Sequence, residues 1–391
     1  MAEPSITIML VVGEPSGDQL GAQLMAGLNE LAPDRLRIVG VGGPAMTAEG
    51  LQSLFPLDAT SVMGLREVVP RIPAILRRVK EATDFALKVR PNLVLLIDSP
   101  DFTHRIAQRL KRLDPSIRTA NYPPPQVWAS RSYRARKMAA YMDAVLTMFP
   151  FEAAFFEKHG IRAYTVGYPV IERAKLMTGG KEFRERRGIA ANAPLLLVLP
   201  GSRRSEIRFI LPPFKGAVEI LARETPGLVT VLPTTGHVGS LVREAASSWP
   251  TPVHVVETGQ EKFAAFDAAD AALAASGTVT SELALSETPM VVGYRLGWLT
   301  YALARPFIHV EHITLINLVL NRRAVPELVQ NDCTPENLAA ALKPLLMDET
   351  ARVKQKRDLE EAVRIFGVGQ ERPSLRAARA VLELAVNRPS P

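Results

Sequence analysis

The stretch ASGTVTSELALSETPMVVGYR, residues 275–295, decides the fold class that we predict for this chain. It opens on a turn of small residues, continues as a helical segment, is stopped by Thr288-Pro289, and ends in a short apolar run of strand character. An alanine-rich, helix-favouring segment precedes it. Helices that alternate with short buried strands are typical of α/β domains with parallel sheets.

The turn in this stretch is Ser276-Gly277-Thr278. A helix that starts after such a turn directs unpaired N–H groups and the positive end of its dipole outward, which suits a diphosphate. One turn further on, the carboxylate of Glu282 can accept hydrogen bonds from two ribose hydroxyls. An ordinary capped helix explains the same pattern, so the nucleotide interpretation depends on the other motifs of the chain.

Length and composition define the class of protein. At 391 residues the chain is too long for one ordinary core, so we expect two domains. A hydrophobic content of 47% with 22% charged residues indicates a globular protein. The net charge of +7 favours acidic partners such as nucleotides, phosphorylated substrates or anionic lipid headgroups. No Lys/Arg block is interleaved with aromatic residues, so we predict no nucleic-acid partner.

The cysteine and histidine content predicts neither a disulfide nor a metal site. Cys333 is the single cysteine, and the six histidines lack metal-ligand spacing, so His104 and His309 are predicted to be structural or surface residues. We predict no metal and no cofactor. The first residues lack the basic region of a signal peptide, and no segment reaches about 18 apolar residues, so we expect a cytoplasmic protein.

The first βα turn of the chain carries acidic and hydroxyl side chains. A strand-like run at 6–12 leads into GEPSGD, residues 13–18, and then a helix. The spacing is neither G-x-G-x-x-G nor a P-loop, and the acidic residues Glu14 and Asp18 would repel a phosphate. We therefore predict that Glu14, Ser16 and Asp18 line a cleft and contact sugar hydroxyls or an acceptor. A tight βα turn without a ligand is the alternative.

Two aspartates follow the apolar run at 92–97. Ligands of open α/β sheets bind at the carboxyl ends of the strands, which is where this position lies. We assign Asp98 as a candidate general base for an acceptor hydroxyl or amine. We predict that Asp101 is the N-cap of a helix over 103–113.

Two further segments of the first half suggest binding surfaces. Trp128 and Arg131, after a stiff triple proline, could present a stacking face and a phosphate-binding fork. Residues 62–80 place apolar residues at helical spacing among arginines, a pattern suited to an anionic membrane surface. A core-facing helix with solvated arginines explains the same spacing, and the pattern alone favours that helix.

The second half repeats the strand–turn–helix order. The apolar run at 195–199 is followed by a turn with Arg203 at the helix start, where an arginine fork and free helix N–H groups would clamp a diphosphate. Asn317 is predicted to return to the same cleft. The predicted domains are two α/β domains, 1–170 and 171–365. Residues 366–391 are predicted to be a helix that packs on the first domain or on a partner subunit.

The motifs taken together resemble one family. In order along the chain they are GEPSGD at 13–18, IDSPDF at 97–102, VWA at 127–129, LPGSR at 199–203, SGT at 276–278, PMVVGY at 289–294, NL at 317–318 and VPEL at 325–328. This set resembles the lipid-A-disaccharide synthases, glycosyltransferase family 19, over nearly the whole chain.

The resemblance implies a fold and a reaction. The fold is the GT-B architecture, α/β with two doubly wound Rossmann-like domains facing a cleft. Residues 1–170 would be the acceptor-side domain and residues 171–365 the UDP-sugar-binding domain. The reaction is transfer, with inversion, of 2,3-diacylglucosamine from its UDP derivative to 2,3-diacylglucosamine 1-phosphate (lipid X). The products are the β-1,6-linked disaccharide 1-phosphate and UDP.

The resemblance also implies roles for individual residues. Asp98 would be the base or an acceptor-positioning carboxylate, Arg203 and Asn317 match UDP-side positions, and Glu282 matches the ribose-binding acid of related enzymes. No metal is needed if arginine and helix ends stabilise the leaving diphosphate. Both substrates carry acyl chains, which favours docking of residues 62–80 on the inner leaflet of the cytoplasmic membrane as a peripheral protein. The family further implies a homodimer through the C-terminal segment.

The chain departs from the family pattern at several positions. They are the triple proline at 123–125, Ser130 for tryptophan, Tyr168 for histidine, Ile316 for proline and Asn321 for glycine. These departures keep three alternatives open: a divergent paralogue with another acceptor, a UDP-sugar epimerase of the same architecture, and a non-catalytic nucleotide-sugar-binding protein. An NAD-dependent oxidoreductase is disfavoured, because no G-x-G-x-x-G follows a strand.

Overall fold

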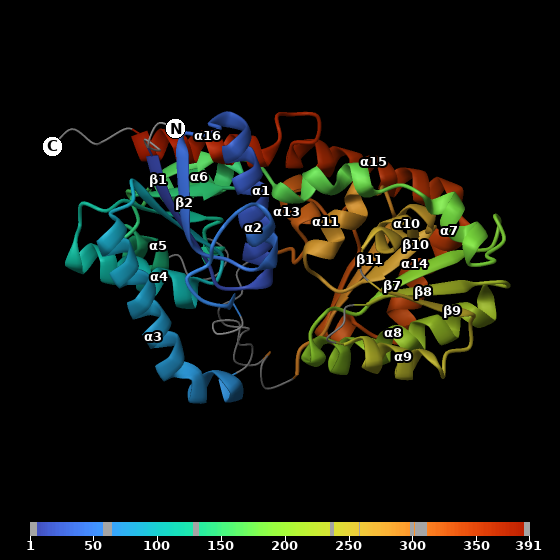
Figure 1. Cartoon of the computed structure of the whole chain (residues 1–391). Coiled ribbons are helices and arrows are strands. Elements are labelled where there is room, and N and C mark those ends of the chain that lie inside the picture. The colour runs from blue at the N-terminus through green and yellow to red at the C-terminus, as the bar shows by residue number, and fades with distance from the viewer. Residues whose placement is uncertain are drawn as a thin grey trace. The chain divides into compact units, whose positions relative to one another are not determined.

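The structure is a computed structural model that describes residues 6–57, 65–127, 133–234, 238–257, 259–297, 301 and 311–386, with the backbone alone for 65–71 and Ser205. The chain divides into two compact units (Figure 1). Unit 1 comprises residues 1–169 and 370–391, and unit 2 comprises residues 170–369. Unit 1 is therefore discontinuous in sequence.

The sheet of unit 1 has six parallel strands in the order β2-β1-β3-β4-β5-β6. The strands are β1 (Ile6–Val12), β2 (Leu36–Val41), β3 (Leu93–Ile97), β4 (Thr119–Tyr122), β5 (Ala144–Thr147) and β6 (Arg162–Thr165). The helices are α1 (Pro15–Leu31), α2 (Pro44–Ala48), α3 (Leu65–Val89), α4 (Pro100–Leu113), α5 (Tyr133–Met138), α6 (Pro150–Glu157) and α16 (Pro373–Val386).

Strand β1 shows why its sequence is almost wholly apolar. Ile8 and Leu10 contribute to one hydrophobic cluster, whereas Met9 and Val11 contribute to another. Successive strand residues point to opposite faces, so a strand with helices on both faces must be apolar at every position. The predicted buried parallel strand at 6–12 is confirmed.

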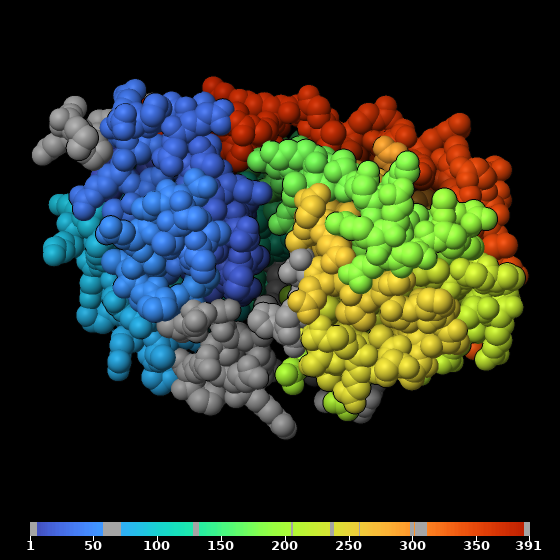
Figure 2. All heavy atoms as spheres, turned by 45° about the vertical axis from the view of Figure 1, so that its right-hand side comes forward, coloured from blue at the N-terminus to red at the C-terminus, as the bar shows by residue number. Residues whose placement is uncertain are grey.

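Helix α16 belongs to the core of unit 1 although it lies at the end of the chain. Its residues Ala377 and Val381 are fully buried in the same cluster as Leu24 of α1. Gly27 of α1 allows the close approach, because a Cβ there would lie 2.7 Å from the carbonyl oxygen of Ser374. Figures 1 and 2 show the red C-terminal helix directly beside the blue N-terminal elements.

The sheet of unit 2 is also six-stranded and parallel, in the order β12-β11-β10-β7-β8-β9. Its strands are β7 (Leu195–Leu199), β8 (Val229–Pro233), β9 (Val253–Val256), β10 (Ala271–Ala274), β11 (Met290–Tyr294) and β12 (Glu327–Val329). Counted within the unit, this is the Rossmann order 3-2-1-4-5-6. The predicted class, a doubly wound α/β fold in each half, is confirmed.

The helices of unit 2 flank this sheet. They are η3 (Pro169–Leu176, whose first residue belongs to unit 1), α7 (Gly180–Arg186), α8 (Arg204–Glu224), α9 (Gly239–Ala246), α10 (Gln260–Ala268), α11 (Thr278–Leu285), α13 (Leu315–Leu320), η5 (Gln330–Asp332), α14 (Pro335–Met347) and α15 (Glu349–Phe366). The core between α8, α14 and the sheet contains Phe214, Leu338 and the buried thiol of Cys333.

The strand order of each unit fixes where a ligand can bind. Open parallel sheets bind ligands outside the carboxyl ends of the strands where the order reverses. In unit 1 this switch point lies between β1 and β3, and in unit 2 it lies between β7 and β10. The four turns that follow these strands carry most of the predicted site residues.

Across the described residues, no helix has both the length and the apolar character needed to cross a bilayer.

Candidate functional site at the two switch points

The turn after β3 has a strained backbone. Asp98 and Ser99 have φ angles of +56° and +44°, so two consecutive non-glycine residues adopt the left-handed region. Such conformations cost about 1–3 kcal/mol each and persist where the surroundings enforce them, often at functional sites. Gly13 of the neighbouring turn makes room, because a Cβ there would lie 2.6 Å from Cβ of Ser99.

Hydrogen bonds fix the half-buried Asp98 in this corner. The Ser16 hydroxyl donates to Oδ2 at 2.5 Å, and the Ser99 N–H donates to Oδ1 at 2.8 Å. The Thr103 hydroxyl donates to the Asp98 carbonyl oxygen at 2.8 Å. Each carboxylate oxygen keeps capacity for another hydrogen bond. The corner therefore presents an oriented carboxylate that can accept a proton from a bound hydroxyl.

The predicted capping role of Asp101 is wrong. Helix α4 begins at Pro100, three residues before the predicted start at residue 103, and its N-cap is Ser99. The fixed φ of proline suits the first helical position, which sets this start. Asp101 lies exposed in the first turn, where its charge favours the helix dipole.

The structure gives Asp18 a structural role in place of the predicted substrate contact. Its buried carboxylate accepts the N–H groups of Gly43, Ala45 and Met46 at 2.7, 2.9 and 3.1 Å. These groups begin α2 and have no intrahelical acceptor of their own. Asp18 thus joins the first turn of α1 to the start of α2, and its oxygens point into the protein.

Replacement of Asp18 by alanine is expected to lower the free energy of unfolding of unit 1 by about 1–3 kcal/mol, because three N–H groups, two of them in buried hydrogen bonds, lose their acceptor. Urea unfolding monitored by circular dichroism measures this change. Glu49→Ala, at the exposed far end of α2, is the matched control and should change stability by less than about 0.5 kcal/mol. Equal effects of the two substitutions would contradict the anchoring role.

Glu14 keeps its predicted position at the switch point. It is the N-cap residue of α1 but makes no capping hydrogen bond through its side chain. The residue is half-buried and follows β1, whose register pairs Val12 with Ile97 immediately before Asp98. Glu14, Ser16 and Asp98 therefore lie on adjacent turns of unit 1.

In unit 2 the turn after β7 differs from the prediction in one respect. Arg203 lies at the start of α8 and its side chain is largely exposed, as a ligand-binding arginine requires. The backbone N–H groups of Ser202 and Arg203, however, donate to Oε2 of Glu206 at 2.9 and 3.1 Å. These N–H groups are therefore not free for a diphosphate, because the carboxylate at the third helical position already caps the helix.

The turn after β10 holds the other candidate diphosphate site. Helix α11 begins at Thr278 after Gly277, which has no side chain to cap it, and both residues are exposed. The first N–H groups of the helix have no intrahelical acceptor. The Ser276 hydroxyl instead donates to the Ile313 carbonyl oxygen at 2.8 Å, so this residue holds the turn in place.

Glu282 lies one turn into α11, as predicted, but is only 3% exposed. Arg173 Nη1 contacts its Oε1 at 2.5 Å, and Lys262 Nζ contacts its Oε2 at 2.6 Å. A buried carboxylate requires such partners, because an unpaired charge in the interior is costly. Glu282 was predicted to bind the ribose, but both of its carboxylate oxygens already have cationic partners in the structure.

Asn317 is fully buried behind the site. Its amide Nδ2 donates to the Val325 carbonyl oxygen at 2.8 Å, and its Oδ1 accepts the Val325 N–H at 2.9 Å. The side chain thus closes the loop between α13 and β12. The structure places Asn317 as a support of this region and does not bring its side chain to the surface of the turn after β10.

The remaining predicted positions have varied outcomes. Trp128 lies outside the described residues, as do Ser130 and Arg131. Tyr168 and Ile316, two departures from the family pattern, are buried, so they alter packing. Asn321 has a φ of +49°, which asparagine tolerates almost as well as the glycine it replaces.

Sequence reasoning missed a polar network behind Asp98. His104 of α4 is buried, with Nε2 3.1 Å from Asn121 Oδ1 and Nδ1 3.2 Å from the Tyr141 hydroxyl. Asn121 Nδ2 donates to the Leu96 carbonyl oxygen, so its Oδ1 faces His104 and Nε2 carries the proton. Burial lowers the pKa of His104 from 6.5 to about 4, against a smaller raising effect of the Asn121 hydrogen bond.

His104 is expected to make unit 1 less stable in mild acid. The unfolded chain binds a proton near pH 6.5 and the folded chain near pH 4, so the contribution of neutral His104 is complete above pH 6.5 and is lost as the pH falls toward 4. At pH 5 this lowers the free energy of unfolding of unit 1 by about 2 kcal/mol relative to neutral pH. Urea unfolding of wild type and His104→Gln at pH 7.5 and 5 measures it. The variant should lose less stability than wild type over this interval, and equal losses would contradict the assignment.

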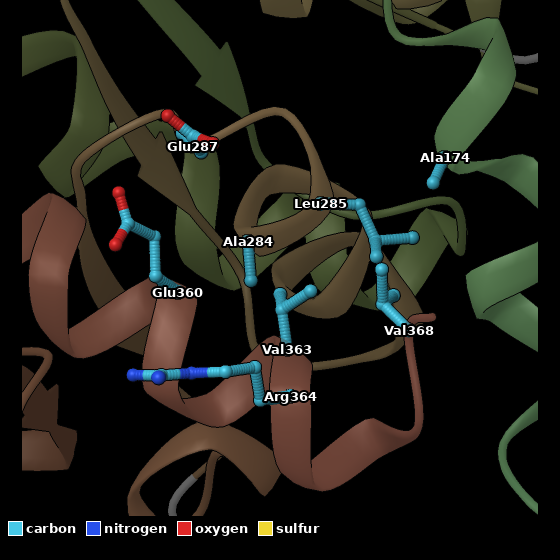
Figure 3. Close-up of a pocket in the computed structure, with 8 residues that line it drawn as sticks. All are labelled: Ala174, Ala284, Leu285, Glu287, Glu360, Val363, Arg364 and Val368. Atoms are coloured by element: carbon cyan, nitrogen blue, oxygen red, sulfur yellow. The ribbon is translucent and has the colours of Figure 1, made fainter. Parts of the chain in front are cut away.

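A pocket of about 340 Å³ lies in unit 2 beside the site. Its walls come from η3, α11, α15 and the turn after α15 (Figure 3). Ala284 and Leu285, at the end of α11, line it together with Val363 and Val368. None of the predicted site residues lines this pocket. Within the described parts of the chain, no three His, Cys, Asp or Glu side chains gather as a metal site.

Two Rossmann-like units, each with a ligand-binding switch point, make up the GT-B architecture. The chain belongs to the lipid-A-disaccharide synthetase family, whose model matches residues 8–381. It is 45% identical over 383 residues to the lipid-A-disaccharide synthase of Rhodospirillum centenum, with 98% of this chain and 96% of the relative covered. It is 44% identical to that of Paramagnetospirillum magneticum, with 96% and 97% covered. The chain is thus a hexosyltransferase of lipid A biosynthesis.

Solved structures with the same fold are more distant in sequence. The UDP-GlcNAc 2-epimerase from Neisseria meningitidis bound to UDP-GlcNAc superposes with a TM-score of 0.64 at 13% identity, covering 97% of this chain and 99% of the other. An S. aureus MnaA–UDP co-structure gives a TM-score of 0.67 at 15% identity, covering 98% and 99%. These similarities establish the shared fold.

Proposed function

We propose that this chain transfers 2,3-diacylglucosamine from its UDP derivative to the 6-hydroxyl of 2,3-diacylglucosamine 1-phosphate, with inversion at the anomeric carbon. The C–O bond between the anomeric carbon and the diphosphate breaks, and the new β-1,6 bond forms to the acceptor oxygen. UDP leaves, and the hydroxyl proton passes to a base. Membership of the family supports this choice of substrates.

Asp98 is the proposed base, and its geometry is the observation that carries the proposal. Its carboxylate lies at the carboxyl end of β3, is oriented by Ser16 and the Ser99 N–H, and is half-buried. A general base has to be held within hydrogen-bond reach of the proton that it accepts. The strained backbone at Asp98 and Ser99 supports the same role, because strain is retained where it serves function. Glu14, on the adjacent turn, is proposed to contact acceptor hydroxyls.

The UDP moiety is proposed to bind at the switch point of unit 2. The guanidinium of Arg203 is exposed, and its ion-pair partner among the described residues is Glu206, at 3.3 Å. We propose that this guanidinium binds the diphosphate. The start of α11, with Gly277 and Thr278, would contribute N–H groups to the diphosphate. Glu282 would bind the ribose. The UDP and UDP-GlcNAc named for the two structural neighbours support a nucleotide site in this fold.

Docking on the inner leaflet of the cytoplasmic membrane is proposed for the described part of residues 62–80. Ile72 and Leu76 of α3 are 43% and 47% exposed, whereas Val79 is buried. Arg77 and Lys80 lie exposed on the same helix. Exposed apolar side chains beside cations suit an anionic lipid surface. Cosedimentation of Ile72→Ser/Leu76→Ser and wild type with anionic vesicles tests this docking, and equal binding of the two proteins would reject it.

A homodimer is part of the proposal, and α16 constrains it. The apolar face of α16 is already buried against α1 in unit 1, so a contact between subunits would use its exposed face or other elements. Sedimentation equilibrium measures the association.

The reaction is tested by turnover of purified protein with UDP-2,3-diacylglucosamine and 2,3-diacylglucosamine 1-phosphate in detergent micelles. Formation of disaccharide 1-phosphate with an equal amount of UDP is the expected result. UDP release only with a different acceptor would indicate a divergent paralogue. UDP binding without any turnover would indicate a nucleotide-sugar-binding protein, and C2-epimerised UDP-sugar would indicate an epimerase.

A further inference from the structure

The two cations that hold Glu282 differ in how firmly they are placed. Lys262 is 22% exposed, and its ammonium lies 5.1 and 5.3 Å from the ring centroids of Phe263 and Phe266, which adds cation–π attraction. Arg173 is 34% exposed, and within the described residues Glu282 is its one ion-pair partner. Arg173 is thus the more exposed and less constrained of the two.

Arg173 lies on a helix of an uncommon kind. Helix η3 is a 3₁₀-helix of eight residues, whereas such helices rarely exceed three or four residues because their hydrogen-bond geometry is poor. The pocket of about 340 Å³ lies against the residue that follows, Ala174. Figure 3 shows Ala174 on one wall and Leu285 and Val368 on the other. Residues 173–176 are partly or fully exposed, whereas residues 169–171 are buried. The pocket and the poorer hydrogen-bond geometry therefore favour a shift of the second half of η3.

Ribose binding at Glu282 conflicts with this arrangement. The carboxylate is 3% exposed, and a ribose diol needs access to both oxygens. Lys262 can remain in place, because each carboxylate oxygen can accept a second hydrogen bond. The more exposed Arg173 has to move before a ligand from solvent can reach Oε1.

We propose that Arg173 competes with the ribose diol of the donor for Glu282 and thereby lowers the affinity of the enzyme for the donor. In the unliganded enzyme Arg173 neutralises the buried carboxylate. On donor binding the diol takes the place of the guanidinium, and η3 moves with it. This inference rests on the proposed role of Glu282 in ribose binding.

Competition predicts a selective gain of affinity when the competitor is removed. In Arg173→Gln, UDP is expected to bind on the order of 10-fold more tightly than in wild type, since the ligand no longer has to break the ion pair. The affinity for 2′,3′-dideoxy-UDP, which has no diol, is expected to stay unchanged. A residue that merely supports the fold would change both affinities in the same direction.

The experiment is isothermal titration calorimetry of the full chain with UDP and with 2′,3′-dideoxy-UDP. Arg187→Gln is the matched control, because Arg187 is 31% exposed and forms an ion pair with Glu261 elsewhere in unit 2. This control should change neither affinity. Arg173→Met, which keeps the apolar stem, is measured in parallel in case the glutamine variant is poorly folded, and the same selective gain is expected.

The possible results separate this inference from the proposed ribose site. Unchanged or weaker UDP binding in both Arg173 variants overturns the competition. If Glu282→Gln leaves the preference for UDP over the dideoxy compound intact, the ribose role of Glu282 is itself wrong. Loss of that preference in Glu282→Gln, with no gain in the Arg173 variants, rejects the competition alone.

Discussion

Replacement of Asp98 by alanine is expected to lower kcat by about 10²- to 10⁴-fold, the range that a positioned general base contributes. The carboxylate is held by Ser16 and by the Ser99 N–H, and alanine removes the oriented group that takes the proton of the acceptor hydroxyl. Binding of UDP should stay within about twofold of wild type, because the proposed UDP residues lie in unit 2. Initial rates in detergent micelles and calorimetry with UDP give the two values.

Asp101→Ala is the matched control for this experiment. Asp101 is an exposed aspartate three residues further along the chain, and its side chain is in the first turn of the same helix. Its removal should change kcat by less than about threefold. Substantial turnover in Asp98→Ala, at more than about a tenth of the wild-type rate, would assign the base to another residue.

Replacement of Val381 by aspartate is expected to unfold unit 1 while unit 2 stays folded. Val381 is fully buried in the cluster shared by α16, α1 and β1, and an unpaired charge there costs several kcal/mol. Typical domains have only about 5–15 kcal/mol of stability in total. The core cluster described for unit 2 contains no residue of α16.

Limited proteolysis with mass spectrometry distinguishes the two units in this variant. A resistant fragment close to residues 170–369 should accumulate, together with rapid cleavage in residues 1–169. Arg379→Asp, on the exposed face of the same helix, is the control and should give the wild-type pattern. If both units of Val381→Asp are degraded together, they unfold cooperatively and the division into two units has no energetic counterpart.

The fold was largely predictable from the sequence because its signals are local. The apolar runs at 6–12 and 195–199 are strands in the structure, as their length and the turns after them indicated. Both faces of each sheet are covered, so these strands are apolar throughout and easily recognised. The position of Asp98 at a strand end followed from the same local pattern.

The contacts that the sequence did not predict join side chains to partners that are distant in sequence, or to partners whose local pattern is incomplete. The N–H groups that bind the Asp18 carboxylate lie 25 to 28 residues further along the chain. The sequence of the first turn does not indicate these partners. Arg173 is 109 residues from Glu282. The cap by Glu206 is local, but no Ser or Thr stands three residues before it, so the capping-box pattern is incomplete.

The return of α16 to unit 1 has a consequence for synthesis on the ribosome. The first 169 residues emerge early, but the helix that completes their core is encoded after residue 369. At about 5–20 residues per second, synthesis of the intervening residues takes about 10 to 40 s. During that time the apolar surface of α1 around Leu24 and Leu28 has no cover from α16. The N-terminal part of unit 1 is thus synthesised first, but its core is completed last. This makes it the part of the chain that a nascent-chain chaperone would protect.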